Sequence, residues 1–233
     1  ATEEGFASEA EIPEQGEPQL PCLVLAIEEP ELYQHPSRQR HMAAVLLKLS
    51  QGAIPGVAKK TQVLYSTHSP LFVGLDRFEQ IRLLRKTDHA AGKPRVTKAV
   101  KAELGAVAEE LWTAGGKQGS KFTANTLRPR LQAVMTPWVN EGFFADVAVL
   151  VEGEDDRAAI LGVAVSMGHN FDSDGISVIP CMGKNNLDRP LVIFRRLGIP
   201  VYVIWDGDNG ETDVKPEDNH RLLRLVGQSD EDW

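Results

Sequence analysis

Short apolar runs alternate with polar turns and longer amphipathic stretches along the chain. The runs at 22–27, 61–65, 147–151, 176–179 and 201–205 are rich in Val, Ile and Leu. Short apolar runs of this kind are typical of buried parallel strands, which are hydrophobic on both faces. The pattern therefore predicts an α/β protein with mostly parallel sheets flanked by helices.

Amphipathic segments between these runs predict the helices. Residues 37–51 and 158–167 have helical character, and a helix over 187–197 is ended by the glycine and proline that follow it. Residues 98–142 repeat their apolar positions with helical spacing, interrupted by a glycine-rich stretch at 115–120. We interpret this segment as a helical connector between two α/β units.

The predicted elements divide the chain into four parts. Residues 1–20 are acidic with little apolar patterning, which predicts a disordered lead-in. We expect residues 21–97 to form a first α/β unit, with a further strand at 80–85. Residues 143–233 are expected to form a second α/β unit. Because the strand at 22–27 has a buried composition but nothing before it supplies neighbouring strands, we expect an N-terminal portion to be missing.

Composition excludes several classes of protein. The 233 residues are 42% hydrophobic and 25% charged, as in a soluble globular protein, and the formal net charge is −8. Any DNA binding must therefore come from a local patch, from metals or from parts not present. Cys22 and Cys181 are expected to be small buried hydrophobes from a reducing compartment. Without a membrane-length apolar stretch or a signal peptide, a cytoplasmic location and no membrane partner are expected.

Acidic residues follow two of the apolar runs. Glu152 and Asp156 come after 147–151, and Asp206 and Asp208 come after 201–205. Because ligands bind at the carboxyl ends of parallel strands, these carboxylates are expected to converge at one sheet edge. Like charges held close together stay ionised when a cation lies between them, and all-oxygen ligands select Mg²⁺ or Mn²⁺ over Zn²⁺. The alternative is that they are solvated residues at loop ends.

The motifs Glu152-Gly153-x-x-Asp156 and Asp206-x-Asp208 resemble the Toprim domain of topoisomerases, primases, recombination mediators and certain nucleases. The resemblance covers residues 145–210 and implies that the four acids are catalytic residues that bind two Mg²⁺ or Mn²⁺ ions. Lys184, in the turn after the middle strand, is expected to contact a phosphate, or alternatively to be solvated.

Residues before the connector resemble the second half of an ABC-type ATPase. Glu28 and Glu29 end the strand at 22–27 as the Walker B acids do, although the usual first acid is Asp, and His68 in Ser-Thr-His-Ser-Pro matches the switch histidine. The sequence has no Gly-x-x-x-x-Gly-Lys-Ser/Thr, whose backbone cradles phosphates. Glu28, Glu29 and His68 are therefore expected to be an orphaned half-site, with ATP bound only in a full-length protein.

The order of an ATPase half followed by a Toprim domain looks like the OLD (overcoming lysogenization defect) nucleases. This resemblance spans 22–210 and implies a Mg²⁺- or Mn²⁺-dependent DNA endonuclease or nickase with a two-metal reaction. It also implies a homodimer formed through the missing ATPase region, in some cases a helicase partner and phage defence, and a Toprim part that is incomplete at its C-terminus. The alternative is a non-catalytic DNA-repair or recombination-mediator module that binds DNA and partner proteins.

Overall fold

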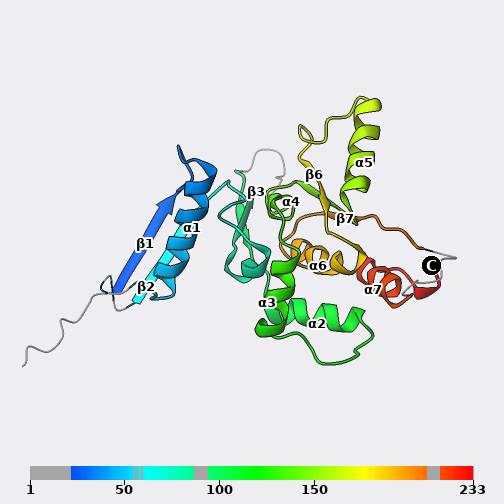
Figure 1. The fold of residues 1–233 in the computed structure, drawn as a ribbon, viewed down its shortest axis with the longest axis horizontal. Coiled ribbons are helices and arrows are strands. Elements are labelled where there is room, and N and C mark those ends of the chain that lie inside the picture. The colour runs from blue at the N-terminus through cyan, green and yellow to red at the C-terminus, as the bar shows by residue number, and fades with distance from the viewer. Residues whose placement is uncertain are drawn as a thin grey trace, which may run out of the picture. The chain divides into compact units, whose positions relative to one another are not determined.

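The computed structural model confirms the α/β class, with parallel strands flanked by helices (Figure 1). It describes residues 22–54, 56, 58, 60–86, 94–208 and 216–232, so the predicted lead-in at 1–20 lies outside the described residues. The chain divides into two compact units, residues 1–67 and 68–233. Among the described residues, none of the helices is long and apolar enough to cross a membrane.

The first unit contains two parallel strands and one helix. Strands β1 (Cys22–Glu28) and β2 (Lys60–Ser66) pair from Cys22 opposite Lys60 to Glu28 opposite Ser66. Helix α1 (Pro36–Ser50) joins them and packs on β2 (Figure 1). Proline suits the first position of a helix because its missing N–H would have had no partner there.

The prediction of a buried strand at 22–27 is wrong for the described structure. Val24 is 65% exposed, and Cys22 is exposed as well. An apolar run shows that a strand is able to be buried, but two strands and one helix cannot cover both faces of a sheet. The prediction of a buried cysteine at position 22 fails for the same reason, whereas Cys181 is buried as expected.

The second unit opens with elements that differ in part from the prediction. The strand expected at 80–85 is shorter, because a 3₁₀ helix, η1 (Leu75–Gln80), precedes it and buries Leu75 and Phe78. Strand β3 (Leu83–Lys86) pairs antiparallel with β4 (Thr97–Val100), which overlaps the start of the segment predicted to be helical. The remaining helical periodicity is confirmed by α2 (Leu104–Ala114), α3 (Ala124–Ala133) and α4 (Pro137–Glu141).

A three-stranded parallel sheet forms the rest of the second unit, in the order β6-β5-β7. Helix α5 packs on β6 and β5, and helix α6 packs on β7 and β5. The elements predicted from the sequence do not include the last helix, α7. The bounds are β5 (Val147–Val151), α5 (Glu154–Ser166), β6 (Ile176–Pro180), η2 (Lys184–Asn186), α6 (Asp188–Arg196), β7 (Val201–Val203), α7 (Pro216–Val226) and η3 (Asp230–Asp232).

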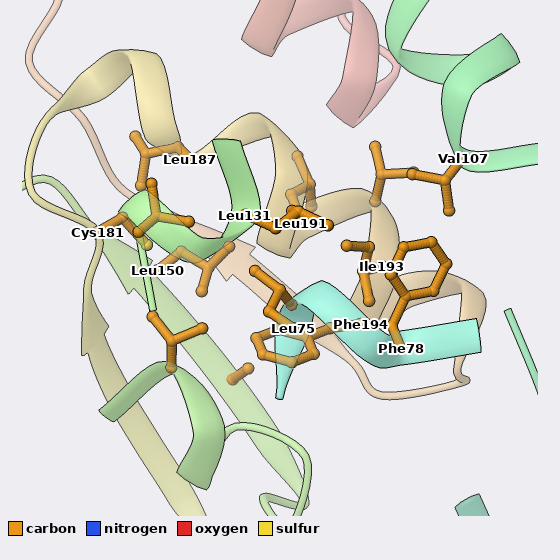
Figure 2. Close-up of a cluster of buried hydrophobic side chains, with 14 of the residues drawn as sticks. Leu75, Phe78, Val107, Leu131, Leu150, Cys181, Leu187, Leu191, Ile193 and Phe194 are labelled. Atoms are coloured by element: carbon orange, nitrogen blue, oxygen red, sulfur yellow. The ribbon is translucent and has the colours of Figure 1, made fainter. Parts of the chain in front are cut away.

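One hydrophobic core joins η1, the helices α2, α3, α4, α6 and α7, and the strands β5 and β6 of the second unit. Figure 2 shows Leu75 and Phe78 from η1 gathered with Leu150 of β5 and Phe194 of α6. Phe194 also packs edge-on against Phe143, with ring centroids 5.1 Å apart. Residues 98–142 therefore share their core with the parallel sheet, which differs from the separate connector that the sequence suggested.

The register of the sheet aligns the carboxyl ends of its strands. Val151 of β5 lies opposite Pro180 of β6, and Leu150 lies opposite Val203 of β7. Parallel strands that end level present the residues following them at one edge. The turns that begin at residues 152, 181 and 204 therefore meet there, and these turns carry the predicted acids and Lys184.

Candidate functional site

Backbone hydrogen bonds continue past the ends of the strands and fix the three turns together. The Cys181 amide donates to the carbonyl of Val151 at 2.9 Å, and the Gly183 amide donates to the carbonyl of Glu152 at 2.7 Å. On the other side, the Ile204 amide donates to the carbonyl of Leu150 at 2.9 Å. The turn after β5 thus lies between the other two, in contact with both.

Glu152 reaches from the end of β5 to the end of β7. Its carboxylate Oε1 accepts the backbone amide of Asp206 at 2.9 Å. Two of the predicted site residues, which are 54 positions apart in sequence, are therefore in direct contact. An amide bonded to an ionised carboxylate forms a stronger hydrogen bond than a neutral pair does, so Glu152 restrains the backbone that carries Asp206.

Lys184 and Asp208 form an ion pair across the same edge. The lysine side chain is only 11% exposed, whereas that of Asp208 is 38% exposed. Of the two expectations for Lys184, a solvated turn lysine does not match this placement. An ammonium group held beside Asp208 is also near the edge where a phosphate would approach.

Asp156 lies in the first turn of α5. This helix begins at Glu154, four residues earlier than predicted, so the acidic turn belongs to the helix. The carboxylate of Asp156 accepts the amide of Gly153 at 2.9 Å and caps the helix. Acids in a first turn are also favoured by the helix dipole. Asp156 therefore stabilises the start of α5, whether or not it also binds a ligand.

The donor atoms suit a hard cation, but their arrangement is not that of an assembled metal centre. Carboxylate oxygens are the ligands that Mg²⁺ and Mn²⁺ prefer. Within the described residues, however, no three His, Cys, Asp or Glu side chains are grouped closely enough to hold an ion. The contacts above give a reason: the ammonium of Lys184 neutralises Asp208, and backbone amides bind Glu152 and Asp156. Glu152, Asp156 and Asp208 thus each have a polar partner within the protein.

Unusual backbone angles occur at this edge. Met182 has φ +60° and Asp208 has φ +52°, in the left-handed region that is uncommon for residues other than glycine. Gly183, between Met182 and Lys184, has φ +115°. Such conformations persist where the surrounding structure enforces them, and they are frequent at functional sites.

A recess of about 450 Å³ adjoins the turn after β5. Its lining includes Gly153, Met182 and the indole of Trp138. The guanidinium carbon of Arg157 lies 3.9 Å from the Trp138 ring centroid, and Arg157 Nε donates to the carbonyl of Val178 at 3.2 Å. The recess is therefore largely apolar, with one aromatic wall held in place by an arginine.

Sequence reasoning missed the residues that support this edge from α6 and α7. Arg189 of α6 donates from Nη1 to the carbonyl of Asn185 at 2.9 Å and so fixes the turn that carries Lys184. Asn219 of α7 contacts the segment that carries Asp206. The spacing of Leu222 and Leu225, which are both buried, is one sequence signal for α7.

The predicted ATPase residues belong to different compact units. Glu28 ends β1, and Glu29 follows with φ +44° while its amide donates to the carbonyl of Ser66 at 3.0 Å. His68 belongs to the second unit and lines a recess of about 350 Å³ that also includes Glu141. Burial raises the pKa of Glu141, against the opposing charge of Arg157.

A parallel sheet with acids at its carboxyl edge, in a chain that starts with part of another α/β unit, defines a TOPRIM-type domain preceded by an ATPase fragment. Comparison with known families agrees. Residues 143–208 match the TOPRIM domain of overcoming lysogenization defect protein-like sequences, and residues 6–73 match an AAA ATPase domain. The first match contains Glu152, Asp156, Lys184, Asp206 and Asp208, and the second contains Glu28, Glu29 and His68.

Two relatives extend this result. The protein named OLD nuclease from Thermus scotoductus (strain ATCC 700910 / SA-01) is 32% identical over 196 residues, covering 84% of this chain and 33% of the relative. The uncharacterized protein YbjD of Escherichia coli (strain K12) is 46% identical over 66 residues, or 28% of this chain and 12% of that protein. The chain thus spans about a third or less of these relatives. Taken together, the matches show that it belongs to the OLD family.

Proposed function

We propose that this chain carries the DNA-cleaving centre of a metal-dependent endonuclease or nickase. The observation that carries the proposal is the joining of Glu152 to Asp206 and of Lys184 to Asp208 at the edge of one parallel sheet. These residues lie within the TOPRIM match, and the Thermus relative is named a nuclease. Because the chain covers only a third of that relative, nuclease activity is a proposal for this chain.

Each residue has a role in this proposal. Asp206 and Asp208 would bind Mg²⁺ or Mn²⁺ on one side of the site, and Glu152 and Asp156 would bind on the other. Two such ions are proposed. They would supply an activated water and screen the phosphate charge. Glu152 would also accept a proton, as a carboxylate placed near a substrate oxygen is able to do. Lys184 would contact a non-bridging phosphate oxygen with its ammonium.

The ATPase half would act only in a longer protein. The sequence lacks the glycine-rich loop and lysine that bind phosphates, so Glu28, Glu29 and His68 are proposed to be part of a site completed elsewhere. In that protein ATP hydrolysis would control cleavage, and the ATPase regions would form the homodimer. A helicase partner and a role in phage defence are proposed for the same longer protein.

Supercoiled plasmid tests the proposed cleavage. Mg²⁺ or Mn²⁺ should give nicked or linear product, and a chelator should abolish it. Asp206→Ala/Asp208→Ala should remove the activity, because the cation would lose its ligands on one side. Asp155→Ala is the matched control: Asp155 is an exposed acid in the same region, and its removal should leave the rate unchanged. Full activity in the double variant would overturn the proposal.

One observation favours a second candidate, the non-catalytic DNA-binding module. The acids are bound by Lys184 and by amides, and within the described part of the chain they form no group able to hold an ion. A module of this kind would retard DNA in a gel and leave the plasmid supercoiled with every divalent metal. Cleavage that depends on Asp206 and Asp208 would exclude it.

A further inference from the structure

Asn219 is a buried polar residue that touches the segment carrying two predicted site acids. It lies in α7 and is fully buried, with 0% exposure. Its Oδ1 accepts the indole Nε1–H of Trp205 at 3.0 Å, and its Nδ2 donates to the carbonyl of Gly207 at 3.0 Å. Its two partners are the residues on either side of Asp206.

We infer that Asn219 is a positioning residue for the Asp206–Gly207–Asp208 segment. It acts by holding the side chain of Trp205 and the backbone of Gly207, on the two sides of Asp206, so that the carboxylates of Asp206 and Asp208 are presented at the sheet edge. The expected effect on DNA cleavage rests on the proposed function. The positioning itself is measurable without a cleavage assay, by Mn²⁺ binding and hydrogen exchange.

The segment after β7 has no strand partner of its own beyond Val203 and is held from two sides instead. On the β5 side, the amides of Ile204 and Asp206 donate to Leu150 and to the Glu152 carboxylate. On the α7 side, Trp205 and Gly207 are bound by Asn219. The contacts alternate along the chain: Ile204 and Asp206 are held through their amides from the β5 side, whereas Trp205, through its indole, and Gly207, through its carbonyl, are held by Asn219.

The chemistry of this position requires a primary amide. An amide side chain offers one acceptor and one donor group, which match the indole N–H and the carbonyl. An ionised Asp would accept but not donate, and Leu would do neither. The two partners also fix the orientation of the amide, because exchanging its oxygen and nitrogen would face donor to donor and acceptor to acceptor.

Helix α7 itself is firmly anchored. Leu222 and Leu225 are buried in the core of the second unit, at 0% and 4% exposure. Arg221 pairs through Nη2 with Asp218 at 3.0 Å and through Nε with the buried Asp188 of α6 at 3.2 Å. A positioning contact is effective when the supporting residue is locked by its own packing, and this condition holds for Asn219.

Loss of this contact should disturb the site more than it disturbs the fold. Residues that orient metal ligands typically change metal affinity or activity by about 10- to 100-fold when mutated. We expect Asn219→Leu, which removes both hydrogen bonds, to lower Mn²⁺ affinity and plasmid nicking by about tenfold or more. Trp205→Phe removes one of the two bonds and should have a smaller effect in both assays.

The experiment compares these variants with Leu222→Ala, a control in the same helix that loses buried packing but keeps Asn219 and its two hydrogen-bonding groups. Calorimetry measures Mn²⁺ binding, and supercoiled plasmid is the substrate for measuring nicking. NMR measures hydrogen exchange at the Asp206 and Gly207 amides. Asn219→Leu should accelerate this exchange and weaken Mn²⁺ binding beyond the control. Combining it with Trp205→Phe should add little, because the two substitutions break one shared hydrogen bond.

Two failures would be distinguishable. If the unmodified chain cleaves DNA and Asn219→Leu matches Leu222→Ala in all three assays, the inference is overturned and the proposed function stands. If the unmodified chain cleaves nothing, the proposed function fails, and the exchange rates and Mn²⁺ affinities still decide whether Asn219 positions Asp206.

Discussion

The two compact units place acids at the ends of similar apolar strands, but they support these acids differently. In the first unit, β1 ends at Glu28 and Glu29 follows it, and the strand is largely exposed. In the second, β5 ends at Val151 and Glu152 follows it, and both Leu150 and Val151 have 0% exposure. Apolar strands thus predict where acids will be presented, whereas the rest of the fold decides how firmly they are held.

The supporting layers explain this difference. Among the described residues before position 68, the buried ones are Pro30, Ala43, Leu46 and Thr61. The second unit buries even charge: Asp188 is 2% exposed, and its burial raises the pKa of its carboxyl group despite the neighbouring Arg189 and Arg221. Ion pairing between Asp188 and Arg221 joins α6 to α7, the two helices that hold the site turns.

The largest expected effect contrasts equivalent acids of the two units. Glu152→Gln keeps an oxygen that accepts the Asp206 amide but removes the negative charge and the proton acceptor. We expect plasmid nicking in Mg²⁺ or Mn²⁺ to fall by about 100-fold or more, the usual scale for losing an acid–base group. Glu29→Gln should leave the rate unchanged. Equal rates for the two variants would show that Glu152 only joins two strand ends.

Core substitutions should separate the units by stability. All four tryptophans lie beyond residue 68, at positions 112, 138, 205 and 233, so their fluorescence reports unfolding of the second unit. Leu150→Ala should lower its free energy of unfolding by about 2–5 kcal/mol, because a fully buried side chain leaves a cavity. Leu23→Ala, at a position 36% exposed, should change it by less than about 0.5 kcal/mol. A similar loss in both variants would mean that the two units unfold together.

The sequence predicted the elements of both units better than their surroundings. Apolar runs followed by acids correctly placed Glu152 and Asp206 at one edge, because strand order and register follow from short βαβ connections. The exposure of β1 was not predictable, because burial depends on layers that a strand does not encode. Asn219 was not predicted for a related reason. A single asparagine in an amphipathic helix has no distinguishing pattern in sequence, and only the fold brings it into contact with Trp205 and Gly207.

The two cysteines give the smallest and most local contrast between the units. Cys22 is exposed on β1, whereas Cys181 is fully buried, and its thiol lies 3.6 Å from the carbonyl of Ile179, to which it donates. Burial raises the pKa of Cys181 from 9.0 to about 12. Its thiolate is therefore disfavoured in the folded state and forms more readily once the chain is unfolded.

This shift predicts a loss of stability at alkaline pH. Below pH 9 the thiol is protonated in both states and contributes no pH dependence; between pH 9 and about 12 the unfolded chain ionises first, so stability falls. The slope should reach about 1.4 kcal/mol per pH unit, measured by denaturant unfolding with tryptophan fluorescence at several pH values. Because lysines and tyrosines also titrate there, the quantity compared is the slope difference between the unmodified chain and Cys181→Ala. That variant should show the shallower slope, and Cys22→Ala should not. Parallel slopes for all three would mean that Cys181 ionises as easily in the folded chain as in the unfolded one.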